Sequence, residues 1–179
     1  MILTSAKALV NSVVQLHAKR PLRQTDIQSA TGLSLRAVQQ ALNSLEKGGA
    51  LRRETLAGST VYVGLTEGPE GRALWNLALA AIGLPALIST QMDHIRTIAL
   101  IGSLARGQER ASSDLDLLIV GKPDQRSLRS AFRELERRYG RQVDAVILTT
   151  EELHSRQEAG DVYVRTAISE AIVLNGRQI

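Results

Sequence analysis

Apolar residues in the first part of the chain recur at the spacing of helices. They follow each other three or four positions apart over residues 3–16, which predicts an amphipathic helix. A shorter helix is expected over residues 27–30, where Asp26 or the threonine before it can cap the first turn. Ser34 caps a third helix, whose apolar face begins at Leu35 and continues at every third or fourth position.

Two strand-like runs follow the third helix. Residues 50–54 and 60–63 flank a glycine-containing loop at residues 57–59, and this arrangement predicts a β-hairpin. Three helices and a hairpin in this order resemble the bacterial winged helix-turn-helix regulators, and the resemblance covers residues 1–66. A small helical module that binds protein through an ordinary polar face would show the same order.

The winged-helix resemblance places the third helix in the major groove of DNA. The side of this helix away from the apolar face carries polar and basic side chains, which can hydrogen-bond base edges or phosphates. The hairpin adds two arginines in the position of a wing. The DNA-binding residues implied are Ser34, Arg36, Gln39, Gln40, Asn43, Arg52 and Arg53.

A hinge at residues 66–69 precedes another helix, with Pro69 suited to its first turn. The apolar stripe over residues 73–82 is rich in alanine and leucine and must be covered by something. It can be covered by the two domains of the same chain or by a second copy. We assign residues 67–92 to a linker helix and expect it to be a dimerisation element of a homodimer.

Beyond this helix the pattern changes to apolar runs rich in β-branched residues, which predict strands. Strands are expected over residues 95–101, 114–120, 143–148 and 171–176, and helices over residues 124–139 and 162–170. Arginines between Arg126 and Arg141 are interleaved with two glutamates. They indicate a solvated helix face, or else a basic strip that binds RNA or a partner protein.

Three aspartates stand where these strands begin. Residues i and i+2 of a strand point to the same face, so Asp114 and Asp116 are expected side by side, and Asp144 opens another apolar strand. Like charges held together cost free energy unless something neutralises them, and Mg²⁺ prefers carboxylate oxygens. Gly102 and Ser103 end the preceding strand, where bare backbone and a hydroxyl can approach phosphate oxygens. For one Asp-x-Asp pair alone, ordinary capping by two acids would be a sufficient explanation.

Residues 102–116, GSLARGQERASSDLD, resemble the signature of the minimal nucleotidyltransferases, small members of the DNA polymerase beta-type superfamily. The third acid of that family falls on Asp144 in QVDAVIL, and the resemblance covers about residues 93–176. The expected fold class is therefore α+β with two small domains. A winged helix-turn-helix occupies residues 1–66, and a mixed-sheet nucleotidyltransferase fold with flanking helices occupies residues 93–179.

The resemblance implies transfer of a nucleoside monophosphate from a nucleoside triphosphate, by in-line attack of an acceptor hydroxyl on the α-phosphorus. Two Mg²⁺ ions would stabilise the attacking and leaving oxygens. The catalytic and metal-binding residues implied are Asp114, Asp116 and Asp144, the last of which also helps to activate the hydroxyl. Gly102 and Ser103 would bind the triphosphate, and Arg106 would either contact phosphate or pair with an acid.

Charge and composition narrow the choice of partners. Residues 1–66 contain eight Lys/Arg and three Asp/Glu, against 14 and 15 in the remainder, so the basic character that suits a polyanion belongs to the first third. The absence of cysteine excludes disulfides, thiolate metal sites and cysteine nucleophiles. Aromatic residues make up only 3%, which argues against base stacking on aromatic platforms. No apolar stretch is long enough to span a membrane, and we expect a cytoplasmic protein.

The nucleotidyltransferase region carries no appended domain for an acceptor, so we expect the acceptor to come from elsewhere. Minimal nucleotidyltransferases commonly act as antitoxins of a small helical HEPN-type partner, and some transfer AMP to it. The resemblance thus implies an antitoxin-like autoregulator whose acceptor is a HEPN-type toxin or an RNA. The alternative is a winged-helix regulator that uses a nucleotidyltransferase fold without turnover, as a nucleotide sensor or a dimerisation unit.

Overall fold

The computed structural model describes the chain except for residues 1–5, 18–20, 66–77, 79–93, 109 and 111. Contacts divide the chain into two compact units, Met1–Ile82 with Arg137–Gly140, and Gly83–Glu136 with Arg141–Ile179. The linker helix expected over residues 67–92 and its apolar stripe lie outside the described residues, apart from Ala78. No helix in the described ranges is both long and apolar enough to cross a membrane.

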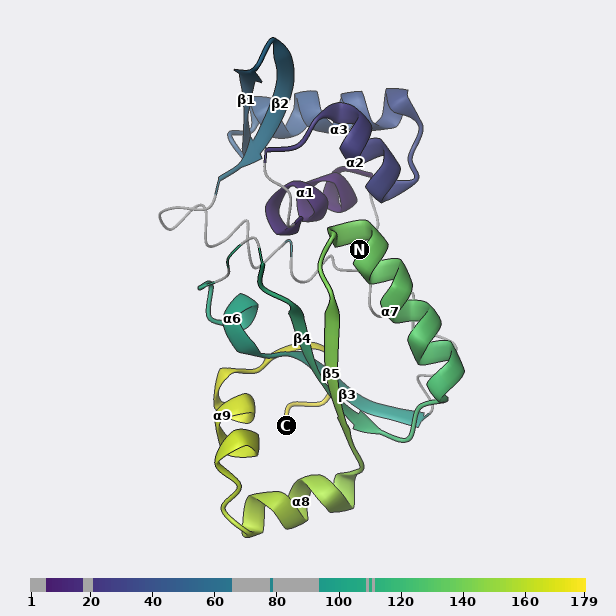
Figure 1. The fold of residues 1–179 in the computed structure, drawn as a ribbon, viewed down its shortest axis with the longest axis vertical. Helices are drawn as coiled ribbons and strands as arrows, with labels where there is room; N and C mark the ends of the chain where they lie inside the picture. Colours follow the sequence, from purple (N-terminus) through teal and green to yellow (C-terminus); the bar gives the residue numbers. More distant parts are fainter. Residues whose placement is uncertain (1–5, 18–20, 66–77, 79–93, 109, 111) are drawn as a thin grey trace. The chain divides into compact units, whose positions relative to one another are not determined.

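Between residues 6 and 65, the described part of the first unit contains three helices and a two-stranded sheet (Figure 1). The elements are α1 (Ala6–Leu16), α2 (Gln24–Thr31), α3 (Leu35–Lys47), β1 (Leu51–Leu56) and β2 (Ser59–Gly64). The strands pair antiparallel, from Leu51 opposite Gly64 to Leu56 opposite Ser59. The helices and the hairpin therefore occur in the order that the sequence predicts.

Capping residues set the ends of α2 and α3, and the structure corrects the predicted start of α2. Ser34 caps α3, because its Oγ accepts a hydrogen bond from the backbone N–H three residues on, at 3.3 Å. Gly32 closes α2 at a φ of 69°, in the left-handed region that glycine tolerates. The expected start of α2 at residue 27 is wrong, since the helix begins at Gln24. Asp26 lies inside it, and its carboxylate accepts a hydrogen bond from the N–H of Arg23 at 2.9 Å.

The second unit is built on a four-stranded mixed sheet in the order β5-β4-β3-β6. Its strands are β3 (Ile95–Leu100), β4 (Leu115–Gly121), β5 (Val143–Leu148) and β6 (Ile172–Gly176). Its helices are α6 (Gly102–Ala105), α8 (Thr150–Glu158), α9 (Val162–Glu170) and α7 (Gln125–Tyr139), whose residues from Arg137 onward belong to the first unit. β4 and β5 are parallel, and β3 pairs antiparallel with both β4 and β6. The structure is thus a mixed α+β fold.

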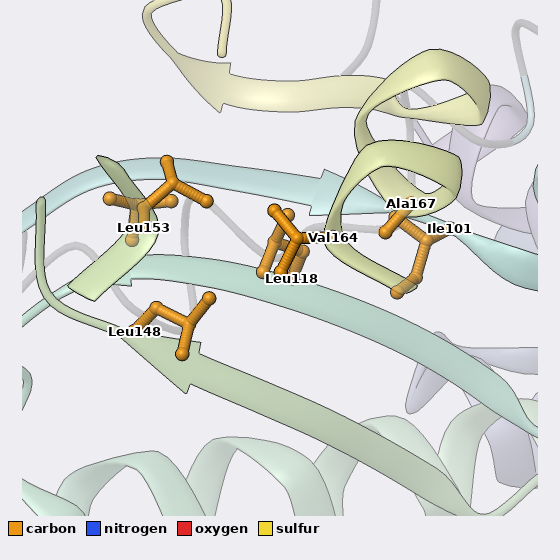
Figure 2. Packing of buried hydrophobic residues seen from close by; sticks show 7 residues of the cluster. Ile101, Leu118, Leu148, Leu153, Val164 and Ala167 are labelled. Carbon is orange, nitrogen blue, oxygen red and sulfur yellow. The ribbon is translucent and has the colours of Figure 1, made fainter. Parts of the chain in front are cut away.

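Helices cover both faces of this sheet (Figure 1). One cluster of buried apolar residues joins α8 and α9 to the strands, and Figure 2 shows its packing: Ile101, Leu118, Val120, Leu148, Leu153, Val164 and Ala167. α7 lies on the opposite side of the sheet from α9 (Figures 1 and 2). The cluster packs α9 over β4, with Val164 of α9 against Leu118 of that strand (Figure 2).

α8 was not expected from the apolar pattern. Leu153 is its buried residue, so the helix has no amphipathic stripe. It begins with a capping box, in which Thr149 Oγ1 accepts from the N–H of Glu152 at 3.1 Å and the Glu152 carboxylate accepts from the N–H of Thr149 at 2.8 Å. The Thr-x-x-Glu spacing was the available signal for this helix.

Candidate functional site

Parallel pairing of two strands brings two of the predicted acids together. Asp116 on β4 and Asp144 on β5 are direct partners in the register of these strands, and residues paired in this way carry their side chains on the same face of a sheet. Asp116 is half-buried, whereas Asp144 is exposed. The expectation for Asp114 needs correction, because β4 begins at Leu115. Asp114 is exposed and lies at the end of the preceding loop.

Gly102 lies directly against the carboxylate of Asp116. Its φ of 71° is in the left-handed region, and a Cβ built there would lie only 2.9 Å from Asp116 Cγ and closer still to Oδ2. The N–H of Ile101 donates to the carbonyl of Asp116 at 3.0 Å, which holds this turn to β4. Ser103 follows in α6 and is half-buried. Gly102 therefore lies beside Asp116, and Ser103 is the next residue of α6.

Asp116 is repelled by the two other acids. Burial raises the pKa of Asp116, and the negative charges of Asp114 and Asp144 raise it further, while Arg106 opposes the shift. The charges of Asp114 and Asp144 both act on Asp116, and we refer to Asp114, Asp116 and Asp144 together as the acidic cluster. Arg106 compensates the negative charge only in part.

The acidic cluster suits a divalent cation by charge and by donor type. Within the part of the chain that the structure describes, no three His, Asp or Glu side chains are arranged so that they could hold a metal ion. Asp114 and Asp144 are exposed, so their side chains can change rotamer. Carboxylate oxygens are the donors that Mg²⁺ prefers, and a cation would relieve the repulsion that raises the pKa of Asp116. Asp114, Asp116 and Asp144 match Mg²⁺ in charge and donor type, but their side chains as arranged in the structure do not form a metal site.

Arg106 pairs with an acid. Its Nη1 donates to Glu170 Oε2 at 2.5 Å and its Nε donates to Gln108 Oε1 at 3.2 Å. Both ion-pair partners are partly exposed, with 39% and 27% of their side-chain surfaces accessible. Of the two roles expected for Arg106, the structure contains the ion pair.

Two residues near the acidic cluster escaped the sequence analysis. Tyr163, half of whose surface is exposed, is in the first turn of α9, next to the residue that packs against Leu118 in the apolar cluster (Figure 2). Burial raises the pKa of the Tyr163 phenol, as do the charges of Asp116 and Asp144. No local sequence pattern indicates this proximity, because it depends on how α9 packs.

Arg141 is the second of these residues, and the expectation that it belongs to a solvated helix face is wrong. It follows α7 and is only 5% exposed. Its Nη1 donates to two backbone carbonyls in the loop before β4, those of Arg110 at 2.8 Å and Ser113 at 2.6 Å. A buried arginine in this position acts on the backbone that leads to Asp114.

In the first unit, the polar side of α3 is exposed as expected. Its core side carries Val38, Ala41, Leu42 and Leu45, and the exposed residues predicted to bind DNA on this helix are Arg36, Gln39, Gln40 and Asn43. The placement of Leu35 on the apolar face is wrong, since Leu35 is 51% exposed. Ser34 is also exposed.

The two arginines of the hairpin differ in their contacts. Arg53 Nη2 donates to Glu46 Oε2 at 2.7 Å and to Asn43 Oδ1 at 3.1 Å, which ties β1 to α3. Arg52 is exposed, and its Nε lies 3.5 Å from Glu54 Oε1. Arg52 is therefore largely open to solvent, whereas the guanidinium of Arg53 is engaged in contacts between β1 and α3.

Residues 86–162 match the family model described as Polymerase beta, Nucleotidyltransferase, which is less than half of the chain. Among solved structures, the chain is similar to a mutant of the toxin–antitoxin MntA–HpeT, with 21% identity over 52% of this chain and 70% of that chain and a TM-score of 0.38. It is also similar to a protein of Sulfolobus solfataricus named as a nucleotidyltransferase, with 18% identity over 64% of this chain and 94% of that chain and a TM-score of 0.34. No curated protein matches the chain.

Proposed function

Starting from the match of residues 86–162 to the nucleotidyltransferase family, we propose that the chain is a magnesium-dependent nucleotidyltransferase. It moves a nucleoside monophosphate from a nucleoside triphosphate to a hydroxyl group on a partner protein or an RNA. The observation that carries this proposal is the pairing of Asp116 with Asp144 across parallel strands, with Gly102 against Asp116. Carboxylates beside bare backbone suit a triphosphate that binds together with divalent cations.

The reaction is an in-line displacement. The acceptor oxygen bonds to the α-phosphorus, the bond from phosphorus to the bridging oxygen breaks, and pyrophosphate leaves. Asp144 is exposed at the start of β5 and takes the proton of the attacking hydroxyl. Asp114, Asp116 and Asp144 would hold Mg²⁺, which when bound supplies the positive charge that stabilises the reacting oxygens.

Binding of the triphosphate falls to the turn after β3. Gly102 lets the phosphate oxygens approach the backbone, and the Ser103 hydroxyl donates a hydrogen bond to them. Arg106 contacts phosphate after its ion pair with Glu170 opens. That pair is partly exposed, so opening it costs at most about 1 kcal/mol.

The first unit supplies DNA binding in this proposal. The exposed polar side of α3 enters the major groove, and Arg52 contacts the phosphate backbone beside it. Dimerisation through residues 67–92 would present two such helices to two half-sites. The whole chain then acts as an antitoxin-like autoregulator, and its acceptor is a HEPN-type toxin or an RNA.

Label transfer tests the enzymatic part. The full chain is added with Mg²⁺ and each α-labelled nucleoside triphosphate to a lysate of its own source cell. Asp116→Asn is the test variant, and Asp124→Asn is the matched control, because Asp124 is exposed at the start of α7 and loses the same charge. Label on one protein or RNA band with the parent and the control, but not with Asp116→Asn, supports the proposal. Equal labelling by all three overturns the catalytic assignment.

Salt-dependent gel shifts test the DNA-binding part. Arg36→Ala is expected to weaken binding and to reduce the slope of log affinity against log salt by about one. Arg129→Ala is the control, since Arg129 is an exposed arginine of the second unit. Equal effects of the two substitutions would remove α3 from the DNA interface.

A second candidate is a winged-helix regulator that binds nucleotide without turnover. The ion pair that engages Arg106 favours this alternative, as does the present arrangement of the carboxylates, which among the described residues form no ready metal site. It predicts that nucleotide with Mg²⁺ changes DNA affinity and is recovered unreacted. A blank labelling lane together with that result would select the regulator.

A further inference from the structure

We propose that Arg141 is a positioning residue for the acidic cluster. Its buried guanidinium holds the loop before β4, which leads directly to Asp114 and on to Asp116, the partner of Asp144 in the sheet. This inference rests on the proposed function, because it concerns the same carboxylates. It assigns to Arg141 no contact with substrate.

The contacts of Arg141 are with backbone rather than with solvent. Only 5% of the residue is exposed, and Nη1 donates to the carbonyls of Arg110 and Ser113 at 2.8 and 2.6 Å. Hydrogen bonds from a charged donor are roughly twice as strong as neutral ones. A buried charge also loses its hydration, which costs free energy. The two hydrogen bonds offset this desolvation cost, which an apolar residue at the same position would not incur.

The two carbonyls belong to a turn that is closed on itself. The N–H of Ser113 donates to the carbonyl of Arg110 at 3.0 Å, and the N–H of Arg110 donates to Ser113 Oγ at 2.8 Å. Ser113 is the residue immediately before Asp114. Any shift of this turn therefore moves the Asp114 carboxylate directly.

Arg141 also stands at the start of the other acidic strand. It lies two residues before β5 and three before Asp144. The next residue, Gln142, accepts a hydrogen bond from the N–H of Leu115 at 2.8 Å, and that bond joins the beginnings of β4 and β5. Arg141 and this bond together connect both acid-bearing strands where the carboxylates lie.

The chemistry of arginine explains why this residue type is used. Its guanidinium is planar and always charged, and its Nη1 carries two hydrogens at a fixed angle, one for each carbonyl. Lysine has the charge on a flexible stem and a shorter reach, so it is expected to keep the turn near its place without fixing it. Methionine keeps an apolar stem and leaves both carbonyls without this donor.

Binding of Mn²⁺ to the full chain tests the inference without requiring turnover. Free Mn²⁺ is measured by electron paramagnetic resonance during titration with MnCl₂. Arg141→Met is expected to weaken Mn²⁺ binding at least about tenfold, since loss of a residue that orients metal ligands costs 10- to 100-fold, and Arg141→Lys is expected to fall between it and the parent. Leu153→Ala is the matched control, because it removes a buried side chain of the same unit away from the turn.

The Mn²⁺ affinities of the parent and the variants decide whether Arg141 has this role. Weak Mn²⁺ binding by the arginine variants, with normal binding by Leu153→Ala, supports a positioning role over a loss of stability. Unchanged Mn²⁺ affinity in a folded Arg141→Met variant overturns it, and if that variant does not fold, parent-like affinity of Arg141→Lys does so. A parent chain that binds no Mn²⁺ overturns both this inference and the metal site, whereas a parent that binds Mn²⁺ but transfers no label overturns only the transferase.

Discussion

Replacing Gly102 by alanine separates the geometry of the acidic cluster from the stability of the unit that carries it. The matched control is Gly160→Ala. The two glycines have φ values of 71° and 70°, and nothing lies within 4 Å of a Cβ built at Gly160. The Cβ at Gly102 would meet Asp116. Both variants therefore acquire the same backbone strain, and only Gly102→Ala displaces a carboxylate.

The magnitudes follow from these two terms. A left-handed backbone costs an L-residue about 1–2 kcal/mol, and the loss of glycine's freedom in the unfolded chain returns about 0.4–1 kcal/mol. We expect either variant to lose about 1 kcal/mol of unfolding free energy. Ordinary contact begins at 3.4 Å, whereas Asp116 Cγ would lie at 2.9 Å, so the carboxylate must retreat by at least about 0.5 Å, and its nearer oxygen by more. A misplacement of about 1 Å can cost 10²-fold in rate.

Urea unfolding and label transfer, run on the same preparations, measure the two effects. Gly160→Ala should match Gly102→Ala in unfolding free energy within about 0.5 kcal/mol and keep the activity of the parent. Gly102→Ala should lose about 10²-fold in kcat/KM. If Gly102→Ala remains as active as the control, the close approach of this turn to Asp116 has no part in the reaction.

Three further perturbations follow from single contacts. The pKa of Asp116 is raised above its ordinary value of 3.8, so ionisation of this carboxyl lowers the stability of the folded chain as the pH rises past that value. Without metal, Asp116→Asn should therefore unfold at a higher temperature than the parent at pH 7. The difference in unfolding temperature should narrow toward about pH 4. Ser34→Ala removes the cap of α3 and should cost about 1 kcal/mol in urea unfolding, whereas no loss would mean that the cap is replaced by water. Glu170→Gln removes the ion pair of Arg106. It should change stability by less than about 1 kcal/mol and raise the affinity for a non-hydrolysable nucleoside triphosphate by calorimetry, and an unchanged affinity would argue against a phosphate contact.

Local chemistry was readable from the sequence. The sequence predicts that Ser34 caps α3, because serine is common immediately before an apolar helical run, and the structure contains this cap. The strands around Asp116 and Asp144 were found because buried strands are nearly continuous in apolar residues, so the acids stand out against them. The parallel register that pairs these two acids is set by the whole sheet, and no short segment contains it.

The residues that sequence reasoning missed depend on contacts far along the chain. Arg141 looks like one more surface arginine, and its burial is explained only by two carbonyls about 30 positions earlier. Tyr163 reaches the acidic cluster through the packing of α9. Asp114 was placed in β4 because Asp-x-Asp alternation fits a strand, but β4 begins at Leu115, after the turn that Arg141 contacts.

The parallel pairing of β4 with β5 also determines when during folding the acids come together. Asp116 and Asp144 are 28 positions apart, and they become neighbours only when the two strands have found each other across the α7 crossover. Parallel strands of this kind pair slowly, because the conformational entropy of closing the loop between them is lost before their contacts stabilise the sheet. The acidic cluster is thus a product of the folding transition. Under the proposed function, a nascent chain that has emerged only as far as β4 lacks the Asp144 carboxylate, and acquisition of Mn²⁺ affinity during refolding would mark the moment at which the sheet closes.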